Sequence, residues 1–382
     1  MDTVYIVLCV KGCDHRPVPL TIWRSSLTRA TAADASPTGI LRSIQALRAL
    51  AALSVVAYHA LQWGPGGFDV GRAGVDVFFV ISGFILWRVT AGRIVAPTDF
   101  LWRRLIRVAP LYWLTTLAVA ATAALWPTFL PQVSPDLGPL LLSLAFVPHL
   151  DPRGLPFPTL PPGWTLNYEA IFYLIFALAL AAPRRWRALA AMGGLMAATA
   201  AGFELADPAY LLGANPMLLQ FAAGVALGWV AEHDALPGAR AGLAMVLSGA
   251  VLLTLIQTQG LFVEFWRPFQ WGAPALLLVA GAVTIEEGLP ARTAPTPAGR
   301  LAVTLGDASY AIYVLHLPVT ALLAHTVGAR QPALFVVVSL IASTLAGLAG
   351  HILVEKPIRR RLRAISPPAA WTRGSTPYSR RS

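Results

Sequence analysis

Long apolar runs separated by short polar segments follow one another along most of the chain. An apolar run of about 20 residues crosses the hydrocarbon core as a helix, because lipid offers the backbone no hydrogen-bond partners. The sequence contains ten such runs, near 40–63, 74–92, 109–128, 164–182, 186–204, 212–231, 240–258, 268–286, 302–324 and 332–354. The stretch at 138–148 is too short to cross, so we expect it to be re-entrant or interfacial. The pattern predicts an all-α fold, a polytopic membrane helix bundle of about ten transmembrane helices.

The composition fits a protein whose solvent is lipid. Hydrophobic residues make up 56% of the 382 residues, charged residues make up 12%, and the mean hydropathy is +0.63. A soluble domain carries about 25% charged residues, so a disordered chain, a coiled coil and a nucleic-acid-binding module are excluded. The two cysteines, Cys9 and Cys13, are too few for a disulfide scaffold or a thiolate metal site, and the sequence shows no metal-ligand motif.

Basic residues set the orientation of the helices, because Lys and Arg accumulate on the cytoplasmic side of a membrane. With the N-terminus in the cytoplasm, four of the 29 Lys and Arg residues fall in outer loops. These four are Arg72, Arg153, Arg267 and Arg330. The opposite topology would reverse the ratio, so the sequence predicts that both termini are cytoplasmic. The net charge of +11 is then mostly a topology signal, and it does not support a nucleic-acid partner.

Polar segments flank the bundle at both ends. Residues 1–39 contain one short apolar stretch, Val4–Val10, which follows Asp2 rather than a positively charged region, so they do not resemble a signal peptide. We expect residues 1–39 to be a disordered cytoplasmic tail with reduced cysteines, or an over-extended start of the chain. Residues 364–382, rich in Ser, Pro, Arg and Thr, are expected to be a second disordered tail. The membrane domain is therefore 40–363, and any chemistry takes place there.

Arg48 and His59 lie within the first apolar span, 11 positions apart. That spacing is close to three full helical turns, so the two residues share one stripe and are about 16 Å apart along the axis. Taken singly, Arg48 is typical of an arginine that snorkels to the inner interface, and His59 of a satisfied interfacial histidine. Together on one face with Gln45 they favour a polar channel lined by that stripe, because ionisable groups at membrane depth usually serve a function.

Two carboxylates also lie within predicted spans. Asp76 stands near the outer end of the second span and could orient His59 or a substrate hydroxyl; the alternative is an acid that caps the helix and compensates its dipole. Glu169 lies about 7–8 Å below Trp164 by helical rise and needs a partner or a task at that depth. The alternative for Glu169 is an interfacial residue beside an aromatic belt. In the ninth span we expect His316 to be structural.

Three arginines gather in Trp102–Leu114, a segment expected to join the second and third spans on the inner side. Arg103, Arg104 and Arg107 place guanidinium groups on adjoining helix faces, a geometry suited to phosphate oxygens. Coenzyme A is a phosphate-rich cytosolic anion that such a cluster could hold. The alternative is plain anchoring of the helix at the inner interface.

Six motifs in order resemble acyltransferase family 3, a group of bacterial integral membrane O-acyltransferases that modify cell-surface sugars. The motifs are Arg-x10-His at Arg48 and His59, GVDVFFVISGF at Gly74–Phe84, RRLIRVAPLYW at Arg103–Trp113, GWTLNYEAIFYL at Gly163–Leu174, LGDASYAIYVLH at Leu305–His316, and VEKPIR. Each piece alone is weak, whereas all six in order make a specific match over 40–363. Many members carry WSL-x-VEE-x-FYL where this chain has Tyr168 and Ala170 around a single Glu169. That variant resembles the exopolysaccharide-production branch.

The resemblance implies transfer of an acyl group, most often acetyl, from a cytosolic thioester such as acetyl-CoA to a sugar hydroxyl. The acceptor would be a cell-surface or exopolysaccharide sugar, including a lipid-linked one, and the enzyme would reside in a bacterial inner membrane among its lipids. No bound cofactor or metal is implied. Under this hypothesis Arg103, Arg104 and Arg107 bind the donor phosphates, and Arg48 lies along the donor path.

Two roles are open for His59 under the same hypothesis. A neutral imidazole serves either as a general base on the acceptor hydroxyl or as a transient acyl carrier. Asp76 or Glu169 would fix its tautomer or hold the acceptor, and the sequence does not say which.

Other functions compete with this one. A transporter or flippase of lipid-linked sugar predicts internal repeats with broken helices at matching positions, and no such period is visible. An acyltransferase for a small acceptor such as a macrolide fits the composition equally well. A structural scaffold leaves Arg48, His59 and Glu169 without a role.

Overall fold

The computed structural model describes residues 41–62, 67–204, 216–263, 266–289, 296–326, 331–364 and 372–373. The predicted N-terminal tail, 1–39, lies outside these residues. The helices are α2 (Arg42–Leu61), α3 (Ala73–Thr90), α4 (Pro97–Leu125), α5 (Leu137–Leu144), α6 (Trp164–Leu180), α7 (Arg187–Glu204), α9 (Leu218–Glu232), α10 (Ala239–Gln259), α11 (Ala273–Glu287), α12 (Pro297–Thr326), α13 (Pro332–Gly350) and α14 (Lys356–Ala364). Short helical turns lie at Asp69–Arg72, Pro161–Gly163, Arg184–Trp186, Pro268–Gly272 and His351–Glu355. Two-residue strands β1 (Arg93–Ile94) and β2 (Thr372–Arg373) pair antiparallel, so part of the predicted C-terminal tail has a partner.

Each predicted span corresponds to a helix, and the prediction of an all-α membrane bundle is confirmed. Among the residues that the structure describes, eight helical segments are long and apolar enough to cross a membrane. The predicted spans at 186–204 and 212–231 correspond to α7 and to the shorter apolar helix α9, which has 15 residues. The stretch at 138–148 overlaps α5, which has 8 residues.

The start of α4 corrects the sequence interpretation. The arginine segment was expected to be a linker, but α4 begins at Pro97 and carries Arg103, Arg104 and Arg107 within its first three turns. Proline at the first helical position has a backbone angle suited to a helix. It lacks a backbone N–H, but an N–H at that position would have no partner within the helix. The arginines therefore lie on a helix of the bundle rather than in a linker.

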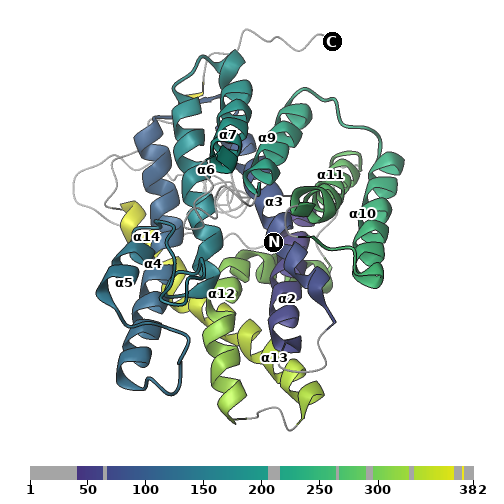
Figure 1. Cartoon of the computed structure of the whole chain (residues 1–382). Coiled ribbons are helices and arrows are strands. Elements are labelled where there is room, and N and C mark those ends of the chain that lie inside the picture. The colour runs from purple at the N-terminus through teal and green to yellow at the C-terminus, as the bar shows by residue number, and fades with distance from the viewer. Residues whose placement is uncertain are drawn as a thin grey trace, which may run out of the picture. The chain divides into compact units, whose positions relative to one another are not determined.

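Helices α2 and α3 lie at the centre of the bundle, with other helices packed around them (Figure 1). Helix α12 packs along α2 and against α13, while α3 packs along α9. On the far side from α4 and α5, α10 packs against α11, and its buried residues are Gly242 and Gly249. Aromatic rings fill the space between α3, α6 and α9, where Phe221 stacks on both Phe79 and Phe172 with centroids 4.3 Å apart in each pair. This packing holds one wall of the cavity described below.

Small residues let α3 and α9 approach closely, as is common between membrane helices. A Cβ on Gly224 would lie 2.1 Å from the carbonyl oxygen of Val80, and a Cβ on Gly83 would lie 2.2 Å from that of Phe221. The obstacle is backbone in both cases, so it cannot rotate away. Both positions therefore require glycine.

We expect Gly224→Ala to lower the free energy of unfolding by about 1–3 kcal/mol, the usual effect of overpacking. Thermal unfolding of the purified protein in detergent measures the change. Gly193→Ala on α7 is the matched control, because a Cβ there meets nothing within 4 Å and alanine favours a helix over glycine by up to about 1 kcal/mol. Equal stability of the two variants would contradict the close packing of α3 on α9.

Candidate functional site

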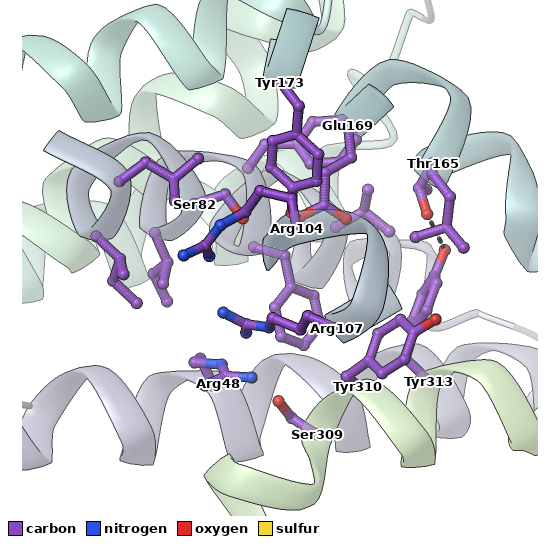
Figure 2. A pocket seen from close by; sticks show the side chains of 17 residues that line it. Arg48, Ser82, Arg104, Arg107, Thr165, Glu169, Tyr173, Ser309, Tyr310 and Tyr313 are labelled. Atoms are coloured by element: carbon purple, nitrogen blue, oxygen red, sulfur yellow. Dashed lines mark hydrogen bonds between the residues drawn. The ribbon is translucent and has the colours of Figure 1, made fainter. Parts of the chain in front are cut away.

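A cavity of about 80 Å³ lies among α2, α3, α4, α6 and α12 (Figure 2). Its wall combines apolar side chains, largely from α3, with ten polar ones. The polar residues are Arg48, Ser82, Arg104, Arg107, Thr165, Glu169, Tyr173, Ser309, Tyr310 and Tyr313. Three arginines and one carboxylate make the lining positively charged. A positive chamber inside an apolar bundle is suited to an anionic ligand.

A chain of hydrogen bonds from α12 positions Arg48. Asp307 Oδ1 accepts from Gln45 Nε2 at 2.7 Å, and Gln45 Oε1 accepts from Arg48 Nη1 at 3.0 Å. Helix α12 begins at Pro297, so Asp307 lies within the helix rather than at its start, and it contacts Gln45 on α2. Arg48 therefore presents a guanidinium that is oriented before any ligand arrives.

The α4 arginines divide between two environments. Arg104 and Arg107 line the cavity, and Figure 2 shows their guanidinium groups on the same side of it as that of Arg48. Within the described residues, the buried Nε of Arg104 has no hydrogen-bond partner. Arg103 does not line this cavity; it lies within electrostatic range of Arg363 on α14. The structure thus brings two of the three predicted donor-binding residues to the cavity.

Glu169 is the carboxylate of the cavity. It projects from α6, and its Oε1 accepts a hydrogen bond from the Tyr173 hydroxyl one turn further along. Tyr173 is buried and lines the same wall. Arg48 and Glu169, which the sequence singled out separately, therefore face one chamber.

An apolar groove of about 430 Å³ adjoins this chamber between α4 and α6. The groove and the cavity share Arg104, Leu166, Glu169 and Tyr173 as lining residues. Trp102 and Leu174, which also line the groove, are exposed on the surface of the protein. The chamber therefore borders an exposed apolar surface of the bundle.

His59 stands apart from the cavity, beside a second histidine. Its Nδ1 is 3.0 Å from the Val55 carbonyl oxygen and 3.2 Å from Nε2 of His316. The His316 ring centroid is 5.7 Å from that of Tyr313, whose ring lines the cavity. The predicted polar stripe thus has two parts: Arg48 borders the chamber, and His59 is connected to it through His316 and Tyr313.

Asp76 is held by Arg267 and Gln220 and is not among the residues that line the cavity. Its Oδ2 is 3.1 Å from Arg267 Nη2, and its Oδ1 accepts from Gln220 Nε2 at 2.8 Å. Asp76 is 0% exposed and Arg267 is 1% exposed. The guanidinium of Arg267 also lies over the rings of Trp271 and Trp164, 4.9 and 5.7 Å from their centroids. The sequence placed Arg267 in an outer loop, whereas the structure makes it the buried partner of Asp76.

Sequence reasoning missed His316 and Tyr313 as members of the site. The available signal was the motif SYAIYVLH, in which the two residues lie three positions apart and so near one face of a helix. Within the described residues there is no group of three or more His, Cys, Asp or Glu side chains that could hold a metal ion.

Comparisons with known proteins show which family the sequence resembles. The sequence model of acyltransferase family 3, described as an acyltransferase domain, matches residues 41–351. The chain is 36% identical over 316 residues to the exopolysaccharide production protein ExoZ of Rhizobium meliloti (strain 1021), a match that covers 80% of this chain and 95% of that protein. It is 26% identical over 360 residues to the peptidoglycan O-acetyltransferase OatA of Listeria monocytogenes, covering 83% of this chain and 56% of that protein. No solved structure matches the chain.

Proposed function

Because the chain belongs to acyltransferase family 3 and is a multi-pass membrane acyltransferase, we propose that it transfers an acyl group from a cytosolic acyl-CoA to a hydroxyl of an exopolysaccharide or other cell-surface sugar. The enzyme belongs to the class of acyltransferases that transfer groups other than aminoacyl groups. The relative named for exopolysaccharide production supports a polysaccharide acceptor over a small diffusible one. The proposed location is the inner membrane of a bacterium, with the donor side facing the cytoplasm.

The observation that carries the proposal is the positive chamber. Arg48, Arg104 and Arg107 face one cavity with a single carboxylate, Glu169. Three guanidinium groups against one carboxylate leave the lining with a net positive charge, and an anion bound between the arginines would offset their mutual repulsion. The phosphates of coenzyme A supply such an anion, and guanidinium groups bind phosphate oxygens through two parallel hydrogen bonds.

The reaction needs a base for the acceptor hydroxyl, and His59 supplies it in this proposal. The hydroxyl oxygen attacks the thioester carbonyl as His59 Nε2 takes the hydroxyl proton. The C–O bond forms and the C–S bond breaks. The proton then passes from His59 to the departing thiolate, so the products are the sugar ester and coenzyme A. A donor bound at Arg104 and Arg107 would extend past Arg48 and Tyr313 toward His59.

The donor site is tested with the purified protein in nanodiscs, radiolabelled acetyl-CoA and 4-nitrophenyl β-D-glucoside as the probe hydroxyl. We expect the wild type to release coenzyme A and to label the glucoside. Arg107→Gln is expected to raise the KM for acetyl-CoA about tenfold or more, since a hydrogen bond between charged groups is lost. The effect on kcat should be smaller, because Arg107 binds phosphates rather than reacting atoms.

Arg240→Gln is the matched control for this measurement. Arg240 is an exposed arginine in the first turn of α10 and does not line the cavity. Its KM for acetyl-CoA should equal that of the wild type. If both variants behave alike, the chamber is not the donor site. If the folded wild type neither binds nor hydrolyses acetyl-CoA, the donor class is wrong.

A further inference from the structure

A buried histidine stands directly behind the proposed base. His316 is 0% exposed, and its Nε2 is 3.2 Å from Nδ1 of His59, although 257 positions separate the two residues. The ring centroids of the two histidines are 4.9 Å apart. On its other side, Nδ1 of His316 lies 2.5 Å from the carbonyl oxygen of Tyr313. His316 thus connects a backbone acceptor on α12 to the imidazole on α2.

These contacts determine which nitrogen atoms carry protons. The Tyr313 carbonyl can only accept, so His316 Nδ1 carries a hydrogen and a neutral His316 has its lone pair on Nε2. Nδ1 of His59 faces that lone pair and the Val55 carbonyl oxygen, which are both acceptors. His59 Nδ1 therefore carries a hydrogen, and the lone pair of a neutral His59 lies on Nε2.

The reverse arrangement is unfavourable. A hydrogen on His316 Nε2 would require the lone pair of His59 at Nδ1, and that lone pair would then face the Val55 oxygen at 3.0 Å. Two acceptors in contact inside a dry bundle repel each other. The contacts of this pair consequently select a single tautomer.

We propose that His316 is a positioning residue, which holds His59 in the Nδ1–H tautomer and accepts its hydrogen bond as His59 takes the acceptor proton. The inference rests on the proposed role of His59 and assigns to His316 the task that the sequence left between Asp76 and Glu169. When Nε2 of His59 gains a proton, the hydrogen bond from Nδ1 to His316 becomes a charge-assisted one and strengthens. The gain appears mainly in the transition state, so it raises kcat rather than binding.

Two substitutions separate this role from packing. His316→Phe keeps a planar ring in the buried site and removes the acceptor, whereas His316→Gln keeps an acceptor oxygen. In the nanodisc assay with acetyl-CoA and the probe glucoside, we expect His316→Phe to lose about 10- to 100-fold in kcat, as for a hydrogen bond to a charged group, with KM for acetyl-CoA unchanged. His316→Gln should recover most of that loss. In the His59→Ala background, His316→Phe should cause no further loss.

The outcomes distinguish failure of this inference from failure of the proposed function. If His316→Phe and His316→Gln lose kcat equally, His316 has a structural role and the inference is overturned. The same holds if His316→Phe lowers kcat as much in the His59→Ala background as it does in the wild type. Full activity of His316→Phe would overturn it as well. Full activity of His59→Ala would instead remove the proposed function of His59. Thermal unfolding of each variant identifies a loss of kcat that comes from misfolding alone.

Discussion

Replacing His59 with Ala is expected to lower kcat for acyl transfer by about 10²- to 10⁴-fold, the range that a positioned general base contributes. The reason is the loss of Nε2, which the contacts of Nδ1 with Val55 and His316 leave unprotonated. The measurement is release of coenzyme A and labelling of the probe glucoside by the protein in nanodiscs. The KM for acetyl-CoA should change little, since the donor phosphates bind at Arg104 and Arg107.

The same experiment decides between the two roles that His59 can play. A transient acyl carrier retains radiolabel on the wild-type protein when the acceptor is omitted, and His59→Ala does not retain it. A general base gives no retained label in either protein. His325→Ala is the matched control. His325 lies in the last turn of α12, the helix that also carries His316, where it stacks on Phe129 and does not line the cavity. Unchanged transfer by a correctly folded His59→Ala would rule out both roles.

Replacing Asp76 with Ala is expected to reduce the free energy of unfolding by about 3–5 kcal/mol, because it leaves a buried arginine charge without its partner. Asp76 and Arg267 are both almost fully buried, and their side chains meet at 3.1 Å. Since the pair connects α3 to the turn before α11, its loss should loosen the bundle as a whole. Thermal unfolding in nanodiscs or detergent measures the effect.

Two companion variants sharpen this prediction. The double variant Asp76→Leu with Arg267→Met should recover much of the loss, since apolar residues of similar volume often replace a buried ion pair without a penalty. Glu287→Ala breaks the Arg88–Glu287 pair, whose side chains are 38% and 26% exposed, and should change stability by less than about 1 kcal/mol. If Asp76→Ala remains fully stable and loses transfer activity, Asp76 acts on the substrate rather than on the fold.

The sequence by itself determined the membrane architecture. Each predicted span corresponds to a helix, and both ends of α2, α3 and α10 agree with the prediction within about two residues. Lipid imposes this regularity, since every backbone group must be satisfied within its own helix and the bilayer sets the length. The helical period also placed Arg48 and His59 on one stripe, because that relation is local to a single helix.

Contacts between helices were decided only by the tertiary structure. The partner of Asp76 is 191 positions away, and the partner of His59 is 257 positions away. Helix faces that meet in a membrane are not marked by a hydrophobic pattern, since lipid and protein neighbours are equally apolar. Asp76 and Glu169 therefore looked like equal candidates to orient His59, and His316 looked structural. Packing of α12 along α2 assigned that contact to His316, because the crossing of two helices fixes which side chains come within hydrogen-bond distance.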